Sequence, residues 1–198
     1  MKNKKNVQAK KTLEHKRRLK AHKRRKEPSL ERKTPQKPEK QNFLIVCEGE
    51  NTEPSYFEQF KLVTASIKVV GQGYNTLSLV NQAHKIVQID RTNGTTYDQV
   101  WCVFDKDDFK DQDFNQAITT ASSYGFNTAY SNQAFEYWFI LHFEAHQGGA
   151  MDRKLYDTKI NKYLNPHNIS YDGKESKTVS SDMFDFMLSI DEKNGKSR

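Results

Sequence analysis

The sequence is poor in cysteine and lacks any long apolar run. Its two cysteines, Cys47 and Cys102, each lie inside a short apolar segment, a placement typical of buried, reduced thiols in a cytoplasmic protein. No further cysteines or histidines stand at the spacing of a four-ligand zinc site. No segment approaches the ~18 consecutive apolar residues that a membrane-spanning helix needs. No apolar segment follows the charged N-terminus, so we expect neither a transmembrane helix nor a signal peptide.

Charge is divided unevenly between two parts of the 198-residue chain. Residues 1–40 contain 17 Lys and Arg against four Asp and Glu, a net charge of +13, whereas the remaining residues contain 15 against 21, a net charge of −6. We therefore predict a basic arm over residues 1–40 and one acidic folded domain over residues 41–198. The acidic body argues against a basic globular DNA-binding fold.

The basic arm has few apolar residues and three prolines in its second half. It cannot bury enough apolar surface to offset the entropy lost on ordering, so we expect it to be disordered when free. Its excess positive charge would bind a polyanion at low salt, which favours a nucleic-acid contact. The alternative is a solvated tail that keeps the protein soluble. The candidate nucleic-acid-binding residues of the arm are Lys16, Arg17, Arg18, Lys23, Arg24 and Arg25.

Strand-like and helix-like segments alternate from Phe43 onward. Phe43–Cys47 and Val100–Phe104 are continuous apolar runs, typical of strands buried on both faces of a parallel sheet. Further patterns predict strands at Ile67–Val70 and Asn127–Tyr130, and helices from a capping Thr52 and at Leu77–Val87, Asp113–Ser123, Phe135–Phe143, Leu155–Leu164 and Ser181–Ile190. This alternation predicts an α/β fold, with a mainly parallel sheet, helices on both faces and further helices towards the C-terminus.

Acidic residues follow both apolar runs. Glu48 and Glu50 come after the first run, and Asp105, Asp107 and Asp108 come after the second. Ligands of open α/β sheets bind beyond the carboxyl ends of the strands, and carboxylates gathered there would repel one another without a divalent cation. Oxygen ligands with few histidines favour Mg²⁺ or Mn²⁺. The alternative is that these acids cap helices and stay solvated.

Three blocks of the sequence carry a family resemblance. They are Ile45–Phe57 (IVCEGENTEPSYF), Phe104–Asp108 (FDKDD) and Ser131–Glu144 (SNQAFEYWFILHFE). In this order they resemble the motifs of RloB-like proteins, which are related to the Toprim superfamily. The resemblance implies a Toprim-like sheet, a divalent metal and phosphodiester chemistry on DNA or RNA, with a transfer RNA as one candidate. It also implies a role in defence against phage beside an ATPase encoded nearby, and it leaves open whether the chain forms a homo-oligomer.

The same resemblance assigns roles to individual acids. Glu48, Asp105 and Asp107 match the catalytic and metal-binding acids, with Glu48 also able to serve as a general base or acid. The further metal ligands implied by the resemblance are Glu53, Asp108 and Glu136. The function expected from this set is a metal-dependent nuclease. The alternative is a non-catalytic subunit that binds nucleic acid or a partner within a defence complex.

Several other residues allow two interpretations. Glu136 belongs either to the site or to the exposed stripe of an apolar helix. Lys106 either contacts a phosphate or is a solvated loop lysine. His142 is interpreted first as a core histidine and second as a catalytic one. Gly49 would let the chain turn tightly and a phosphate come close, and Trp138 is expected in the core.

Overall fold

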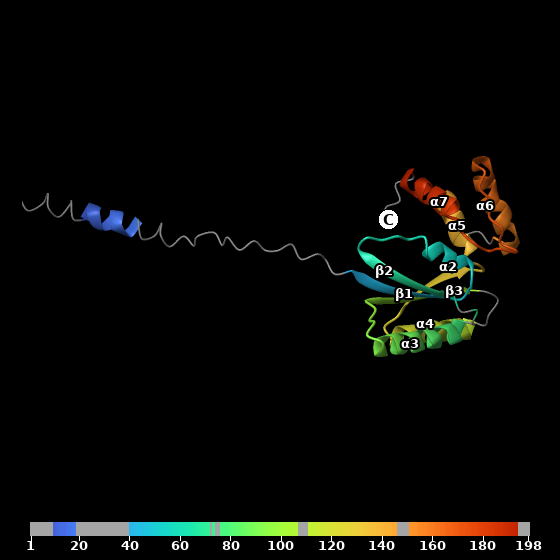
Figure 1. Ribbon diagram of the computed structural model, residues 1–198, viewed down its shortest axis with the longest axis horizontal. Coiled ribbons are helices and arrows are strands. Elements are labelled where there is room, and N and C mark those ends of the chain that lie inside the picture. The colour runs from blue at the N-terminus through green and yellow to red at the C-terminus, as the bar shows by residue number, and fades with distance from the viewer. Residues whose placement is uncertain are drawn as a thin grey trace, which may run out of the picture. The chain divides into compact units, whose positions relative to one another are not determined.

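Four parallel strands form the centre of the folded unit (Figure 1). The computed structural model describes residues 10–18, 40–71, 73, 76–106, 111–145 and 151–193. The strands lie in the order β2-β1-β3-β4, and every adjacent pair is parallel. Their bounds are β1 Gln41–Cys47, β2 Ala65–Gly71, β3 Gln99–Lys106 and β4 Asn127–Asn132.

The two apolar runs of the sequence are the two central strands, β1 and β3. Successive side chains of a strand point to opposite faces of the sheet. Leu44 and Val46 accordingly pack into one core cluster, while Ile45 and Cys47 pack into another. A strand that is covered on both faces must be apolar at every position, which explains the continuous runs.

Helices cover both faces of the sheet (Figure 1). On one face lie α3 and α4, which pack Leu79 and Ala117 against β1 and β3. On the other face lie α2, α5, α6 and α7, with Tyr56, Phe139 and Met183 in their shared core. The predicted α/β class is confirmed. The helices are α2 Thr52–Phe57, α3 Thr76–Thr92, α4 Asp111–Ser123, α5 Glu136–Phe143, α6 Tyr156–Leu164 and α7 Ser181–Lys193, with the short 3₁₀ turns η1 Arg153–Leu155 and η2 Asn165–His167.

Local details differ from the expectations at two positions. Thr52 does not cap α2: Asn51 occupies that position, with no side-chain capping hydrogen bond. Thr52 is instead buried in the first turn, where its Oγ1 lies 3.5 Å from Tyr171 Oη. Trp138 was expected in the core, but 48% of its surface is exposed. Its indole N–H donates to Tyr56 Oη at 3.0 Å, so the polar end is satisfied while the ring faces outward.

The thiols behave as the sequence indicates. Cys47 and Cys102 are free and buried. Burial raises the pKa of Cys102 to about 12 and raises the pKa of Cys47 as well. Both therefore stay protonated at neutral pH and act as small apolar core residues.

The chain divides into two units, Met1–Pro38 and Glu39–Arg198. In the first unit, residues 10–18 form a helix whose side chains are all exposed. The good helix formers of this segment explain the helix. Residues 1–9 and 19–39 of the arm lie outside the described residues, and disorder of the free arm stays a prediction. Among the described helices, none combines the length and the apolar character needed to cross a bilayer.

Candidate functional site

Acids of the first and second motif blocks meet where β1 and β3 end. Glu48 follows β1 directly, and Asp105 is the last residue but one of β3. The backbone N–H of Glu48 donates to the carbonyl of Val103 at 2.9 Å, which continues the pairing of the two strands. The carboxylate of Glu48 then accepts the backbone N–H of Asp105 at 3.1 Å. The two acids predicted from separate strands therefore lie side by side at one edge of the sheet.

Glu53 is folded back against the turn that follows β1. Its Oε1 accepts the backbone N–H of Gly49 at 3.2 Å, and only 4% of its surface is exposed. A Cβ at Gly49 would lie 2.1 Å from Glu53 Oε2. The close approach that Gly49 permits is therefore that of a carboxylate. This differs from the expectation that a phosphate would use this space.

The electrostatics of Glu53 reflect its burial. Loss of solvent raises the pKa of its carboxyl, and the neighbouring Glu136 raises the pKa further. The backbone N–H groups of Glu53 and Gly49, together with Lys177, lower the pKa by less. Burial and the repulsion from Glu136 therefore disfavour the charged form of the Glu53 carboxyl. A bound cation would offset both effects.

Glu136 joins the group from the start of α5. Its Oε1 accepts the hydroxyl of Tyr171 at 2.8 Å, and the same hydroxyl lies 3.5 Å from Thr52 Oγ1. Burial raises the pKa of Tyr171, and the negative charge of Glu136 acts in the same direction. Tyr171 therefore stays a neutral donor that holds the Glu136 carboxylate at the site rather than on an exposed stripe.

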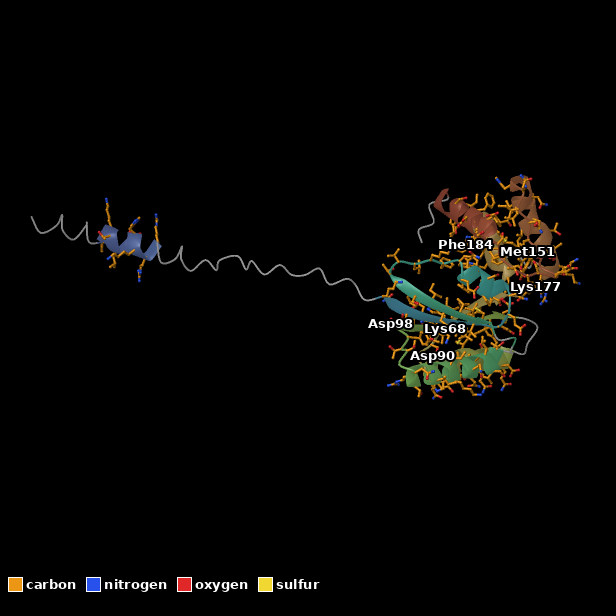
Figure 2. All side chains as sticks on the ribbon, in the orientation of Figure 1. Lys68, Asp90, Asp98, Met151, Lys177 and Phe184 are labelled. Carbon is orange, nitrogen blue, oxygen red and sulfur yellow. The ribbon has the colours of Figure 1, made fainter. Side chains whose placement is uncertain are left out.

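These acids line a single pocket with a volume of about 780 Å³. Its acidic residues come from the turn after β1, from α2, β3, α5 and α6, and its basic residues come from η1 and the turn before α7. The acidic residues are Glu48, Glu50, Glu53, Asp105, Glu136 and Asp157, and the basic residues are Arg153, Lys154, Lys174 and Lys177. Figure 2 shows Lys177 on the side of the fold where the strands end.

The other predicted site residues are either outside the described residues or outside the pocket lining. Asp107 and Asp108 fall outside the described residues, as do Lys23, Arg24 and Arg25. Lys16, Arg17 and Arg18 belong to the exposed helix of residues 10–18. Lys106 is exposed at the end of β3, with its ammonium 5.5 Å from the centroid of the Phe114 ring.

The described acids do not form a ready-made metal cage. Within residues 10–18, 40–71, 73, 76–106, 111–145 and 151–193, no three His, Cys, Asp or Glu side chains are grouped closely enough to hold a metal ion. The donor set nevertheless suits a hard divalent cation, because it consists of carboxylate oxygens that repel one another.

His142 lies in the core, outside the pocket lining. It is 6% exposed, with Nδ1 2.5 Å from Asp191 Oδ2 and Nε2 3.1 Å from Tyr56 Oη. This placement supports the interpretation of His142 as a core histidine whose two ring nitrogens are hydrogen-bonded.

Sequence reasoning missed Tyr171, Asp157 and the four basic residues of the pocket. The available signal was the Asp172-Gly173 pair, which marks a turn and is followed by Lys174 and Lys177. Nothing in the sequence shows that this turn returns to the carboxyl ends of β1 and β3.

A known protein family matches this chain, whereas a search of curated proteins and a search of solved structures find no match. The family model described as RloB-like protein matches residues 43–194, which include the pocket, α7 and all of the sheet except the first two residues of β1. This match covers more than half of the chain, and the three motif blocks lie within it. The chain therefore belongs to the RloB-like family.

Proposed function

We propose that this protein is a metal-dependent nuclease that hydrolyses phosphodiester bonds in DNA or RNA. The observation that carries the proposal is the meeting of Glu48 and Asp105 at the carboxyl ends of adjacent parallel strands, in a pocket that also contains Glu53 and Glu136. Carboxylates brought together in this way are suited to holding Mg²⁺ or Mn²⁺.

The residues of the proposed site have distinct roles. Glu48 and Asp105 would hold the cation, with Glu53 and Glu136 as further carboxylate ligands and Asp107 and Asp108 completing the set. A bound Mg²⁺ or Mn²⁺ ion supplies Lewis-acid stabilisation of negative charge on phosphoryl oxygens, and one or two ions fit this role. Glu48, which lies on the pocket wall, is also the candidate for moving a proton to or from the reacting oxygens.

The biological setting is proposed from family membership. A nuclease of this family is expected to act in defence against phage, by damaging nucleic acid when infection is sensed, with an ATPase partner encoded nearby. A transfer RNA is one candidate substrate.

A second candidate function is a non-catalytic subunit of a defence complex. It is favoured by one observation: among the described residues, the acids of the pocket are not grouped as a metal site. In this alternative the Glu48 carboxylate would serve to join β1 and β3 through the N–H of Asp105.

The two functions are separated by a cleavage assay. The full chain is incubated with DNA and with total RNA in Mg²⁺ or Mn²⁺, with and without the neighbouring ATPase. Glu48→Gln and Asp105→Asn test the site, and Asp185→Asn is the matched control because Asp185 is an exposed acid of α7 outside the pocket lining. Cleavage by the wild type and the control, but by neither site variant, supports the nuclease. Equal cleavage by all four proteins rejects the catalytic assignment.

A further inference from the structure

The pocket lining contains two groups of residues of opposite charge, called here the acidic wall and the basic wall. The acidic wall comes from the ends of β1 and β3, from α2 and from the starts of α5 and α6. The basic wall consists of Arg153 and Lys154 from η1, and Lys174 and Lys177 from the turn before α7. All four basic residues are exposed. Their charge also reaches the acidic wall, since Lys177 lowers the pKa of Glu53.

Hydrogen bonds fix the backbone of η1 against the sheet. The N–H of Arg153 donates to Gln133 Oε1 at 2.9 Å, in the turn that follows β4. The N–H of Lys154 donates to Asp152 Oδ1 at 2.9 Å. Tyr156, directly after η1, donates its hydroxyl to the carbonyl of Asn132 at 3.2 Å. The first pair of basic residues is thus attached to the end of β4.

The second pair of basic residues is held by a different set of contacts. Asp172 Oδ1 accepts the N–H of Lys174 at 3.0 Å, and the Asp172 carbonyl accepts the N–H of Lys177 at 2.8 Å. The side chain of Asn161 exchanges hydrogen bonds of 2.7 and 2.8 Å with the backbone of Tyr171. The backbone of each of the four basic residues is therefore held in place by a hydrogen bond of its N–H group.

The aromatic residues of the pocket cannot serve as platforms for bases. Phe135 and Tyr156 line it, but only 5% and 2% of their surfaces are exposed. Sequence-tolerant stacking requires an exposed aromatic face. Stacking of bases on these two rings is therefore excluded, and the four basic residues favour contacts to the charged backbone of a strand, which carries no sequence information.

We infer that Arg153, Lys154, Lys174 and Lys177 bind the phosphates of a nucleic-acid strand on either side of the bond that faces the acids. This inference rests on the proposed function and names the part of the substrate that the pocket recognises. A strand satisfies both walls, because its phosphates pair with the four cations while one phosphodiester faces the metal-binding carboxylates. The contacts predict binding that is independent of base sequence.

The test measures binding without cleavage. A fluorescent single-stranded oligothymidylate is titrated with the full chain in Ca²⁺ over a range of KCl concentrations. The pocket variant is Lys174→Ala/Lys177→Ala. The matched control is Lys85→Ala/Lys162→Ala, which removes two exposed lysines from α3 and α6 outside the pocket lining. For two lost phosphate contacts, the slope of log K against log salt should become shallower by about 1.4 and affinity should fall about tenfold at moderate salt.

The expected result is a shallower slope for the pocket variant only, with the same loss on oligoadenylate. An equal slope change in both variants overturns the inference. Displacement of the strand by thymidine 5′-monophosphate at the strand's own affinity also overturns it, because the pocket would then be a nucleotide site. If the pocket variant melts at a lower temperature, Lys174→Gln repeats the test with a smaller perturbation, and its slope should become shallower by about 0.7.

Failure of this inference is distinguishable from failure of the nuclease proposal. In one outcome the pocket variant shows a shallower slope of log K against log salt, while the wild type cleaves no nucleic acid under any condition. This outcome supports phosphate binding by the basic wall and counts against the nuclease. In the other outcome the wild type cleaves nucleic acid, and the slope of log K against log salt is unchanged in the pocket variant. This outcome supports the nuclease and rejects phosphate binding by the basic wall.

Discussion

The carboxylate of Glu48 accepts the backbone N–H of Asp105 at 3.1 Å, across 57 positions of sequence. The contact exists because β1 and β3 are adjacent and parallel, with Cys47 paired to Val103 at their ends. Carboxyl ends of parallel strands open at the same edge of a sheet. The pairing register therefore decides that these two acids share a pocket.

Neutralising Glu48 or Asp105 should abolish metal binding without lowering the stability of the fold. In EDTA, Glu48→Gln and Asp105→Asn should unfold at the same temperature as the wild type or a higher one, since each removes one of several carboxylates that repel one another. Addition of Mn²⁺ should raise the melting temperature of the wild type but not of the variants, because a ligand that binds only the native state stabilises it. Thermal melts of the three proteins with and without Mn²⁺ provide the measurement. A lower melting temperature of the variants in EDTA would indicate a purely structural role.

Gly49→Ala should destabilise the protein through Glu53. The added methyl group would lie 2.1 Å from Glu53 Oε2, so the buried carboxylate must leave its place and lose the N–H of Gly49. We expect a loss of about 1–3 kcal/mol, as for other overpacked sites. In a double-mutant cycle by denaturant unfolding, Glu53→Ala should remove most of this loss. Additive effects of the two changes would show that the loss does not arise from Glu53.

His142→Phe should cost about 2–4 kcal/mol of the free energy of unfolding. The imidazole contacts Asp191 from one nitrogen and Tyr56 from the other in a buried setting. A phenyl ring fills similar space but leaves both groups without this partner. Denaturant unfolding at neutral pH measures the change. His84→Phe is the control, since His84 is a half-buried residue of α3 that stacks on Tyr124, and its loss should be within about 0.5 kcal/mol.

Asp90 should make a small contribution to stability that depends on pH. Its carboxylate lies 2.6 Å from Lys68 Nζ (Figure 2) and also accepts the hydroxyl of Tyr97. Lys68 first, and then Tyr97, lowers the pKa of Asp90 below its ordinary value of 3.8. A folded-state pKa below the unfolded one gives stability that is complete above the ordinary value and is lost as the pH falls through the lowered one.

Asp90→Asn should therefore lower the free energy of unfolding at pH 7 by less than about 1 kcal/mol, because water and salt screen this pair. The difference from the wild type should shrink as the pH falls below the ordinary value of an aspartate. Denaturant unfolding at several pH values measures it. A difference that is constant with pH would mean that the ion pair is not its source.

The arm should contribute to nucleic-acid affinity through charge alone. Replacing Lys16, Arg17 and Arg18 with alanine removes three exposed charges from the helix of residues 10–18. The slope of log K against log salt for a single-stranded oligonucleotide should become shallower by up to about 2. Unchanged affinity and slope would identify the arm as a solubilising or partner-binding segment.

The main elements of the fold were predictable because burial leaves a direct pattern in the sequence. The continuous runs at Phe43–Cys47 and Val100–Phe104 became the central strands β1 and β3. The orientation of helix α5 could not be predicted from the sequence in this way. Its segment is apolar almost throughout, so its sequence does not indicate which face turns outward, and Trp138 was assigned to the core although it is half exposed.

The two acids at the ends of β1 and β3 were also predictable, because strand ends are recognisable and parallel strands open at one edge. Glu48 and Asp105 could be brought together by that rule alone. The basic wall of the pocket could not be predicted in this way. Lys174 and Lys177 follow β4 by more than 40 positions and belong to no regular element, so no periodicity connects them to the sheet.

The sequence by itself determined the α/β class, the two central strands and the edge at which the acids gather, because these depend on local apolar runs and on the direction of parallel strands. Only the tertiary structure decided that Tyr171 holds Glu136, that Glu53 fills the space beside Gly49 and that four basic residues line the same pocket as the acids. Those relationships depend on how the segment from η1 to α7 packs back over the sheet. That packing arises from many weak contacts between residues far apart in the chain, and no local pattern encodes it.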